Sequence, residues 1–244
     1  MSADPDEAAA AAARALAGRL VSYWQERLGA ELLGAYLIGS LAHGGFSHRY
    51  SDIDLALVTE AGLSAPALED ARNTALALSP DWGGKVSIFW TDRRFSLGRF
   101  PPLDRIDLLD HAIVLTEREK VRPERPSLEQ IREYLGAAPF AAWAERARGF
   151  AGAQSLTRKD HKAYLRALLY PGRFCYSWLT GRMGSNDEAV AHLRERSVRG
   201  LDIDLIDRAL QCRRSAADPD ALFPARAALP AQIDACGALL TCHT

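Results

Sequence analysis

The stretch IGSLAHGGFSHRYSDIDLALV, Ile38 to Val58, decides how this chain is interpreted. It joins two apolar runs, and the second run opens with Asp52 and Asp54. Carboxylates are poor strand formers and costly to bury, so two of them at the start of a buried strand need a compensating partner. Because alternate residues of a strand share a face, these carboxylates would point the same way, about 7 Å apart along the backbone. A Mg²⁺ ion fits this arrangement, since it takes one or two protein carboxylates and keeps its other positions for water and phosphate oxygens.

A glycine and a serine end the first apolar run. Gly39 allows the backbone to turn tightly after the strand, and Ser40 begins a turn or short helix whose N–H groups and hydroxyl can hold an anion. An anion-binding turn and a pair of carboxylates on neighbouring strands together indicate a nucleoside triphosphate with Mg²⁺ as the ligand.

This composite pattern resembles the DNA polymerase β-like nucleotidyltransferase superfamily. The matching residues are Gly39-Ser40-Leu41-Ala42-His43-Gly44-Gly45, followed by Ser51-Asp52-Ile53-Asp54-Leu55 and an apolar strand. The resemblance implies an α/β nucleotidyltransferase domain with a small mixed sheet. It implies that Asp52 and Asp54 are the catalytic metal ligands, and that the nucleotide-binding residues are Gly39, Ser40 and Ser51. The implied reaction is in-line attack of an acceptor hydroxyl on the α-phosphate, with pyrophosphate leaving.

One part of the family pattern is missing from the next strand. The resemblance implies a third carboxylate there, which helps to deprotonate the acceptor, but the run KVSIFW has Lys85 and Ser87 near its start. Asp92 lies seven residues after Lys85, roughly 23 Å at strand rise, and is therefore expected at the wrong end of the strand. Asp81 would reach the acidic pair only if the DWGG turn folds back. The sequence identifies no general base.

Other interpretations of these residues stay open to different degrees. A calcium-binding EF-hand loop needs an oxygen ligand near Ala56, and a serine-nucleophile elbow needs Gly-x-Ser-x-Gly around Ser40; both patterns are absent. Solvated surface acids are a simpler alternative. Within the enzyme class the acceptor could be a protein side chain or an RNA end, and the missing third acid leaves open a nucleotide-binding module with reduced catalysis.

Composition narrows the class of protein. The chain has 244 residues, 48% of them hydrophobic, and a formal net charge of −1, so nothing global indicates nucleic-acid binding. No signal-peptide pattern and no transmembrane window occur, so we expect a cytoplasmic protein, either a monomer or a homodimer. The four cysteines lack zinc-site spacing and are expected to be buried reduced thiols: Cys175, Cys212, Cys236 and Cys242.

Two domains are expected, residues 1–122 and 123–244, divided at the charged, proline-containing stretch REKVRPERPS. In the first domain, a helix over 6–28 precedes short apolar runs that alternate with a helix over 65–77, which is typical of α/β patterning. The segment RFPPLDR, residues 99–105, is expected to be an extended connector because its prolines fix φ.

The second domain should be an all-α helical bundle. Helical spacing predicts helices over residues 128–152, 157–180, 186–196, 203–213 and 231–241. Pro171 with Gly172 should kink or break the second of these helices. Ser185 is expected to cap the third, with Glu188 completing a capping box.

The helical half resembles the C-terminal domain of bacterial aminoglycoside adenylyltransferases of the streptomycin/spectinomycin type. The resemblance rests on FCYSWLTGRMGSNDEAVAHL, and on PPLDRIDLLDHAIVLTERE at the end of the first domain. It implies transfer of AMP from ATP to a hydroxyl of an aminoglycoside-like acceptor. Asn186 stands after Ser185 where that family typically has a lysine. Residues 155–214 contain twelve basic and seven acidic side chains, a balance of +5 that argues against a strongly acidic acceptor site. A generic hydroxyl-bearing small molecule is therefore the expected acceptor.

Overall fold

The computed structural model describes residues 5–215 and 217–241, and the chain separates into two compact units, Met1–Arg125 and Pro126–Thr244. The division falls inside the stretch REKVRPERPS, where the sequence also predicted a boundary, after residue 122. The N-terminal unit combines a small sheet with helices, and the described part of the C-terminal unit is helical. The predicted fold class is confirmed.

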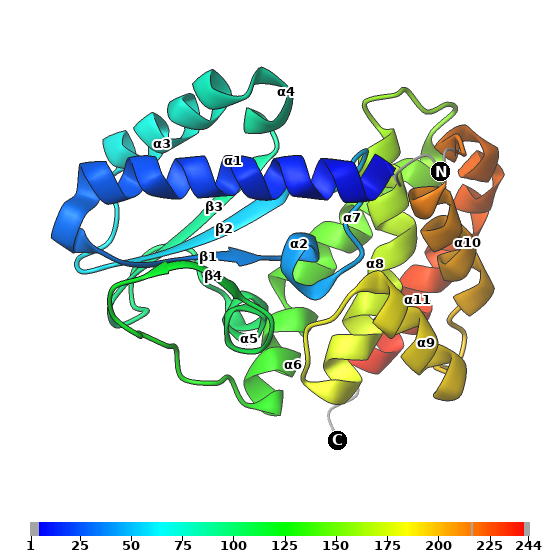
Figure 1. Cartoon of the computed structure of the whole chain (residues 1–244). Helices are drawn as coiled ribbons and strands as arrows, with labels where there is room; N and C mark the ends of the chain where they lie inside the picture. Colours follow the sequence, from blue (N-terminus) through cyan, green and yellow to red (C-terminus); the bar gives the residue numbers. More distant parts are fainter. Residues whose placement is uncertain (1–4, 216, 242–244) are drawn as a thin grey trace. The chain divides into compact units, whose positions relative to one another are not determined.

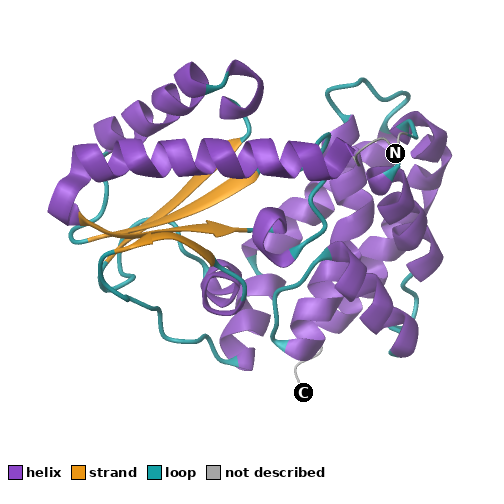
Figure 2. Cartoon of the chain, viewed as in Figure 1, coloured by secondary structure: helices purple, strands orange, loops and turns teal. Residues whose placement is uncertain are grey.

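The sheet of the N-terminal unit is mixed. Its four strands are β1 (Leu32–Ile38), β2 (Ile53–Thr59), β3 (Val86–Asp92) and β4 (Ile113–Glu117), in the spatial order β3-β2-β1-β4. Figure 2 shows them as one layer. Strand β1 runs antiparallel to β2 and β4, whereas β2 and β3 are parallel. The parallel pairing places the starts of β2 and β3 at the same edge of the sheet.

Helices cover both faces of this sheet (Figure 1). Helices α1 (Pro5–Leu28) and α3 (Ala65–Leu78) pack on one face, where Leu55 and Leu57 of β2 join their core. Helix α5 (Pro102–Asp110) lies on the other face, where Ala56 and Val58 share a second core with its Leu108. Since alternate residues of a strand share a face, Asp54 belongs to the α5 face. Short elements complete the unit: η1 (Gly29–Glu31), α2 (Ser40–His43) and α4 (Pro80–Gly83).

The segment RFPPLDR is not an extended connector throughout, as the sequence analysis expected. Helix α5 begins at Pro102, with the extended Pro101 as its N-cap residue. Proline is well suited to the first helical turn, because its missing N–H would have no helical partner there and its φ already matches the helix. The prediction was wrong because the same restriction on φ is compatible with a helix start.

Seven helical segments make up the described part of the C-terminal unit: α6 (Leu128–Gly136), α7 (Ala138–Gly152), α8 (His161–Thr180), α9 (Asn186–Glu195), α10 (Ile203–Arg214), η2 (Pro219–Ala228) and α11 (Leu229–Thr241). The predicted helix over 128–152 is in fact two helices, interrupted at Ala137. Pro171 does not break α8, which continues to Thr180. A Cβ at Gly172 would lie 3.2 Å from the Ile206 side chain, so this buried stretch packs tightly on α10. An internal helix proline costs about 3 kcal/mol, and close packing of this buried stretch on α10 acts in the opposite direction.

Two smaller predictions for this unit are confirmed. The Ser185 hydroxyl accepts a hydrogen bond from the Glu188 backbone N–H at 3.2 Å, and the Glu188 carboxylate accepts one from the Ser185 N–H at 2.7 Å, which completes the capping box. The three described cysteines are buried: Cys175, Cys212 and Cys236. A hydrogen bond to Cys175 and burial raise the pKa of the Cys236 thiol far above its ordinary value. Cys242 lies outside the described residues. None of the described helices is both long and apolar enough to span a bilayer.

Candidate nucleotide and metal site

Gly39 makes the bend between β1 and α2. Its φ of 70° and ψ of −156° belong to a backbone region that is essentially restricted to glycine. A Cβ at this position would lie 2.3 Å from an Asp54 carboxylate oxygen, so the carboxylate rests directly against the glycine. The antiparallel register supports this arrangement, because Ile38 is paired with Asp54. The structure therefore brings the predicted bend and one of the predicted acids together.

Two serines join the bend to the residue before the acidic pair. The Ser40 hydroxyl lies 3.1 Å from the Ser51 hydroxyl oxygen, and the Ser51 oxygen also accepts a hydrogen bond from the Ser47 N–H at 2.9 Å. Ser51 is buried, whereas Ser40 and Asp52 are partly exposed. Asp52 follows Ser51 directly and lies one residue before β2. Gly39, Ser40, Ser51 and Asp54 thus form one contiguous group, with Asp52 adjacent in the chain.

Lys85 anchors the loop between α2 and β2, which contains Ser51 and Asp52. Its ammonium donates a hydrogen bond to the His48 carbonyl oxygen at 2.7 Å and lies 4.6 Å from the centre of the Trp82 ring. His48 is held from a second side, because its backbone N–H donates to the Asp6 carboxylate of α1 at 2.8 Å and its ring Nδ1 lies 2.6 Å from the same oxygen. Lys85 therefore positions the loop, a role that the sequence did not indicate.

The register of β2 and β3 shows which residue of β3 lies beside Asp54 and where Asp92 lies. Asp54 is paired with Ser87, and Thr59 at the far end of β2 is paired with Asp92. The expectation that Asp92 lies at the wrong end of β3 is confirmed. Although burial alone raises the pKa of Asp92, hydrogen bonds from Leu97 and Ser96 lower it to about 2. Asp92 therefore stabilises the turn that follows β3.

Asp107 of α5 is a residue of this site that the sequence analysis missed. Its side chain is 2% exposed, and its Oδ2 accepts a hydrogen bond from the Gly39 backbone N–H at 2.7 Å. Its Oδ1 is buried without a hydrogen-bond partner among the described residues. The available signal was a proline pair followed by Leu103 and Ile106 at helical spacing, which predicts a helix start rather than an extended segment. The hydrogen bond from the Gly39 N–H to Asp107 fixes the orientation of the bend.

The donor set at this site suits a magnesium ion. Asp52 and Asp54 would supply the carboxylate oxygens that Mg²⁺ prefers, and the absence of a side chain at Gly39 leaves room for the Asp54 carboxylate. Among the described residues, one group of three His, Cys, Asp or Glu side chains has its ligand atoms within 4.8 Å of one another, and it lies in the C-terminal unit: His161, Asp218 and Asp220. In the described part of the chain, Asp52 and Asp54 belong to no such group of three.

The chain thus combines a small mixed α/β unit, in which a glycine-serine bend packs on an acid of an Asp-x-Asp segment, with a helical unit. The structure is similar to the crystal structure of spectinomycin adenyltransferase AAD(9) from Enterococcus faecialis with ATP and spectinomycin. The TM-score is 0.62, and the match covers 91% of this chain and 98% of that chain at 11% sequence identity. At this identity the likeness shows the fold. No family model matches the sequence, and no curated protein matches it.

Proposed function

We propose that this protein is a Mg²⁺-dependent nucleotidyltransferase that transfers AMP from ATP to a hydroxyl of an aminoglycoside-like small molecule. The supporting observation is the Asp54 carboxylate resting against the Gly39 bend, with the Ser40 and Ser51 hydroxyls in contact beside it. The similarity in fold to an adenyltransferase whose crystal structure contains ATP and spectinomycin adds support.

In this proposal the two acids bind the metal ion, and the serines beside the bend orient the nucleotide. Asp52 and Asp54 hold Mg²⁺, which when bound neutralises the charge that develops on the transferred phosphoryl group. Ser40 and Ser51 orient the triphosphate through their hydroxyl groups. Asp107 is a positioning residue, because its hydrogen bond to the Gly39 N–H fixes the bend against Asp54. Such fixed geometry matters because a misplacement of 1 Å costs about 10²-fold in rate.

Deprotonation of the acceptor is the weak point of the site. Ser87 is paired with Asp54 in the register, where the resemblance implies a carboxylate. A serine hydroxyl takes up no proton near neutral pH, so in this proposal the N-terminal unit contributes little general-base catalysis. Since a general base contributes roughly 10²–10⁴-fold, we infer slow transfer compared with an enzyme that has the third acid.

Transfer of label from ATP tests the proposal. The enzyme is incubated with Mg²⁺, ATP labelled at the α-phosphate, and a panel of hydroxyl-bearing small molecules that includes aminoglycosides. Wild type and the control Asp81→Asn, a change to an exposed acid of α4, should label an acceptor and release pyrophosphate. The double variant Asp52→Asn with Asp54→Asn should do neither.

Two outcomes would contradict the proposal. Transfer that persists in the double variant would remove Asp52 and Asp54 from the mechanism. Tight binding of ATP with Mg²⁺, but no release of pyrophosphate with any acceptor, would show a nucleotide-binding module instead.

A further inference from the structure

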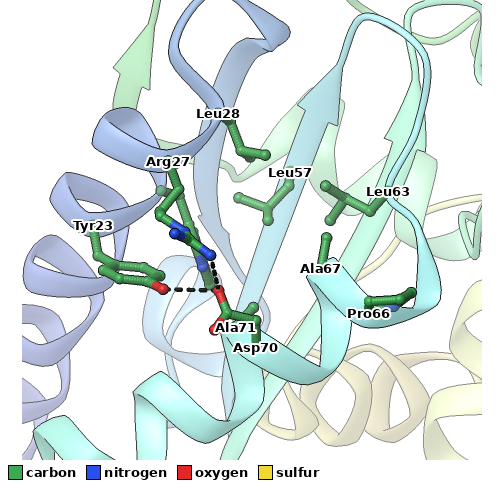
Figure 3. A pocket seen from close by; sticks show the side chains of 10 residues that line it. Tyr23, Arg27, Leu28, Leu57, Leu63, Pro66, Ala67, Asp70 and Ala71 are labelled. Atoms are coloured by element: carbon green, nitrogen blue, oxygen red, sulfur yellow. Dashed lines mark hydrogen bonds and ion pairs between the residues drawn. The ribbon is translucent and has the colours of Figure 1, made fainter.

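The N-terminal unit contains a pocket on the opposite face of the sheet from Asp54. It has a volume of 480 Å³ and lies between the C-terminal half of α1 and the start of α3, with Leu57 of β2 at its floor (Figure 3). Leu57 packs in the core on the α1 and α3 face, whereas Asp54 belongs to the α5 face. The sheet itself therefore separates this pocket from the candidate nucleotide site.

Most of the pocket wall is apolar. Its aliphatic side chains come from three different elements and the loop after β2: Leu28, Leu57, Leu63, Pro66, Ala67 and Ala71. Small-molecule sites have volumes of roughly 300–1,000 Å³ and combine such walls with a few polar groups that set orientation. A pocket of 480 Å³ is large enough for a ligand with an apolar body.

The polar groups of the pocket offer mainly hydrogen-bond donors. The Tyr23 hydroxyl donates to Asp70 Oδ2 at 2.8 Å, and the Arg27 guanidinium lies 3.5 Å from the same oxygen (Figure 3). An exposed ion pair at this distance is weak, and a guanidinium has five N–H donors, so most of those of Arg27 stay available. Trp24 also lines the pocket, and its buried indole N–H has no hydrogen-bond partner among the described residues.

We propose that this pocket binds a small apolar molecule that carries one carboxylate. The apolar body lies against Leu57 and Ala67, and the carboxylate accepts hydrogen bonds from Arg27. A cationic head group is disfavoured, because Asp70, the acidic group of the pocket wall, already accepts a hydrogen bond from Tyr23, and the Arg27 guanidinium beside it repels a like charge. This inference does not depend on the proposed nucleotidyl transfer, since the two sites lie on opposite faces of the sheet.

A series of eight-carbon ligands tests the chemistry of the pocket. Octanoate, octanol and octylamine share one apolar body and differ only in the head group. Isothermal titration calorimetry of the whole chain without nucleotide should show saturable binding of octanoate, with a Kd at least tenfold lower than for octanol or octylamine. The Kd should stay the same when ATP and Mg²⁺ are added.

Two variants with matched controls assign the binding to this pocket. Ala67→Phe fills the pocket, and Ala77→Phe places the same side chain at an exposed position of α3. Arg27→Gln removes the proposed carboxylate donor, and Arg19→Gln makes the same change at an exposed position of α1. The Kd of octanoate should rise at least tenfold in the two pocket variants and stay unchanged in the two controls.

Arg27→Gln keeps the test valid if Ala67→Phe misfolds. The Arg27 side chain is 63% exposed, so its replacement leaves the core intact. Absence of saturable octanoate binding by wild type would overturn the proposal. So would unchanged affinity in both pocket variants, or tighter binding of octylamine than of octanoate.

Discussion

The two ends of the paired strands β2 and β3 both carry acidic side chains, but their surroundings differ. At one end Asp54 rests against the glycine bend and is paired with Ser87. At the other end Asp92 is paired with Thr59, and its two oxygens accept hydrogen bonds from Ser96 and Leu97. An acid that already satisfies a local turn is structural, whereas an acid beside a bend with a predicted anion-binding role is a candidate ligand. The neighbours of an acid, more than its presence, distinguish the two roles.

The largest expected effect separates the two ends directly. Asp54→Asn should lower the rate of AMP transfer by about 10³-fold, because charge stabilisation at the transferred phosphoryl group is lost. Asp92→Asn should leave the rate unchanged. Initial rates of label transfer measure both variants. An equal loss of transfer rate in the two variants would contradict a catalytic role for Asp54 and a structural role for Asp92.

A second prediction concerns the bend. Gly39→Ala should lower kcat by about 10²-fold, because the new Cβ displaces the Asp54 carboxylate. Gly44→Ala is the matched control, since Gly44 has φ of 93° and no heavy atom within 4 Å of the added Cβ. Both changes strain the backbone by about 1–3 kcal/mol, so kcat is compared per folded molecule. An equal loss of kcat in Gly44→Ala and Gly39→Ala would contradict this role of the bend.

The hydrogen bond between the Gly39 N–H and Asp107 can be tested by measuring the stability of the protein. Asp107→Leu should lower the free energy of unfolding by about 2 kcal/mol, because the Gly39 N–H loses its acceptor. Asp107→Asn keeps an acceptor oxygen of the same size and should have a smaller effect. Urea denaturation gives both values. If asparagine destabilises the protein as much as leucine, the hydrogen bond to Gly39 is not the reason for this carboxylate.

A further prediction is a gain in the rate of AMP transfer when a carboxylate is introduced on β3 beside Asp54. Ser87→Glu places a carboxylate at the position paired with Asp54, and transfer should rise by about tenfold, less than the 10²–10⁴ of an optimised general base. Ser87→Gln, which has the same length without the proton acceptor, should give no increase. Rates across a range of pH would show a new ionisation only in the glutamate variant. A rate increase with glutamine would assign the effect to packing rather than to base catalysis.

The smallest expected effect is the pH dependence of the structural end. The pKa of Asp92 is lowered from 3.8 to about 2 in the folded protein, so its stabilisation is present above 3.8 and is lost as the pH falls through about 2. At pH 3 the loss should be about 1 kcal/mol of unfolding free energy relative to neutral pH. Asp92→Asn should lack this component, and urea denaturation of both proteins at pH 7 and pH 3 gives the difference. An identical pH dependence in the two proteins would contradict the assignment.

The features that the sequence predicted are those encoded locally. The apolar run after Asp54 and the glycine at position 39 specify a strand and a bend without reference to distant residues, and the structure contains both. The capping box of Ser185 and Glu188 is equally local, since both partners lie in one helical turn.

The features that the sequence missed depend on distant partners. Asp107 reaches Gly39 across 68 residues, and the ammonium of Lys85 reaches His48 across 37. The continuity of α8 through Pro171 also depends on packing, because Gly172 lies against Ile206 of another helix. No spacing rule within a short window contains this information. The motif therefore predicted the acidic pair, but not the residues that contact the bend and the loop beside it.

The most direct test is a crystal structure with Mn²⁺ and a non-hydrolysable ATP analogue, with the metal located by its anomalous signal. The proposal predicts a Mn²⁺ peak between the carboxylates of Asp52 and Asp54, with the triphosphate against Ser40. A peak confined to the three-residue group that contains His161, with none at the acidic pair, would contradict it.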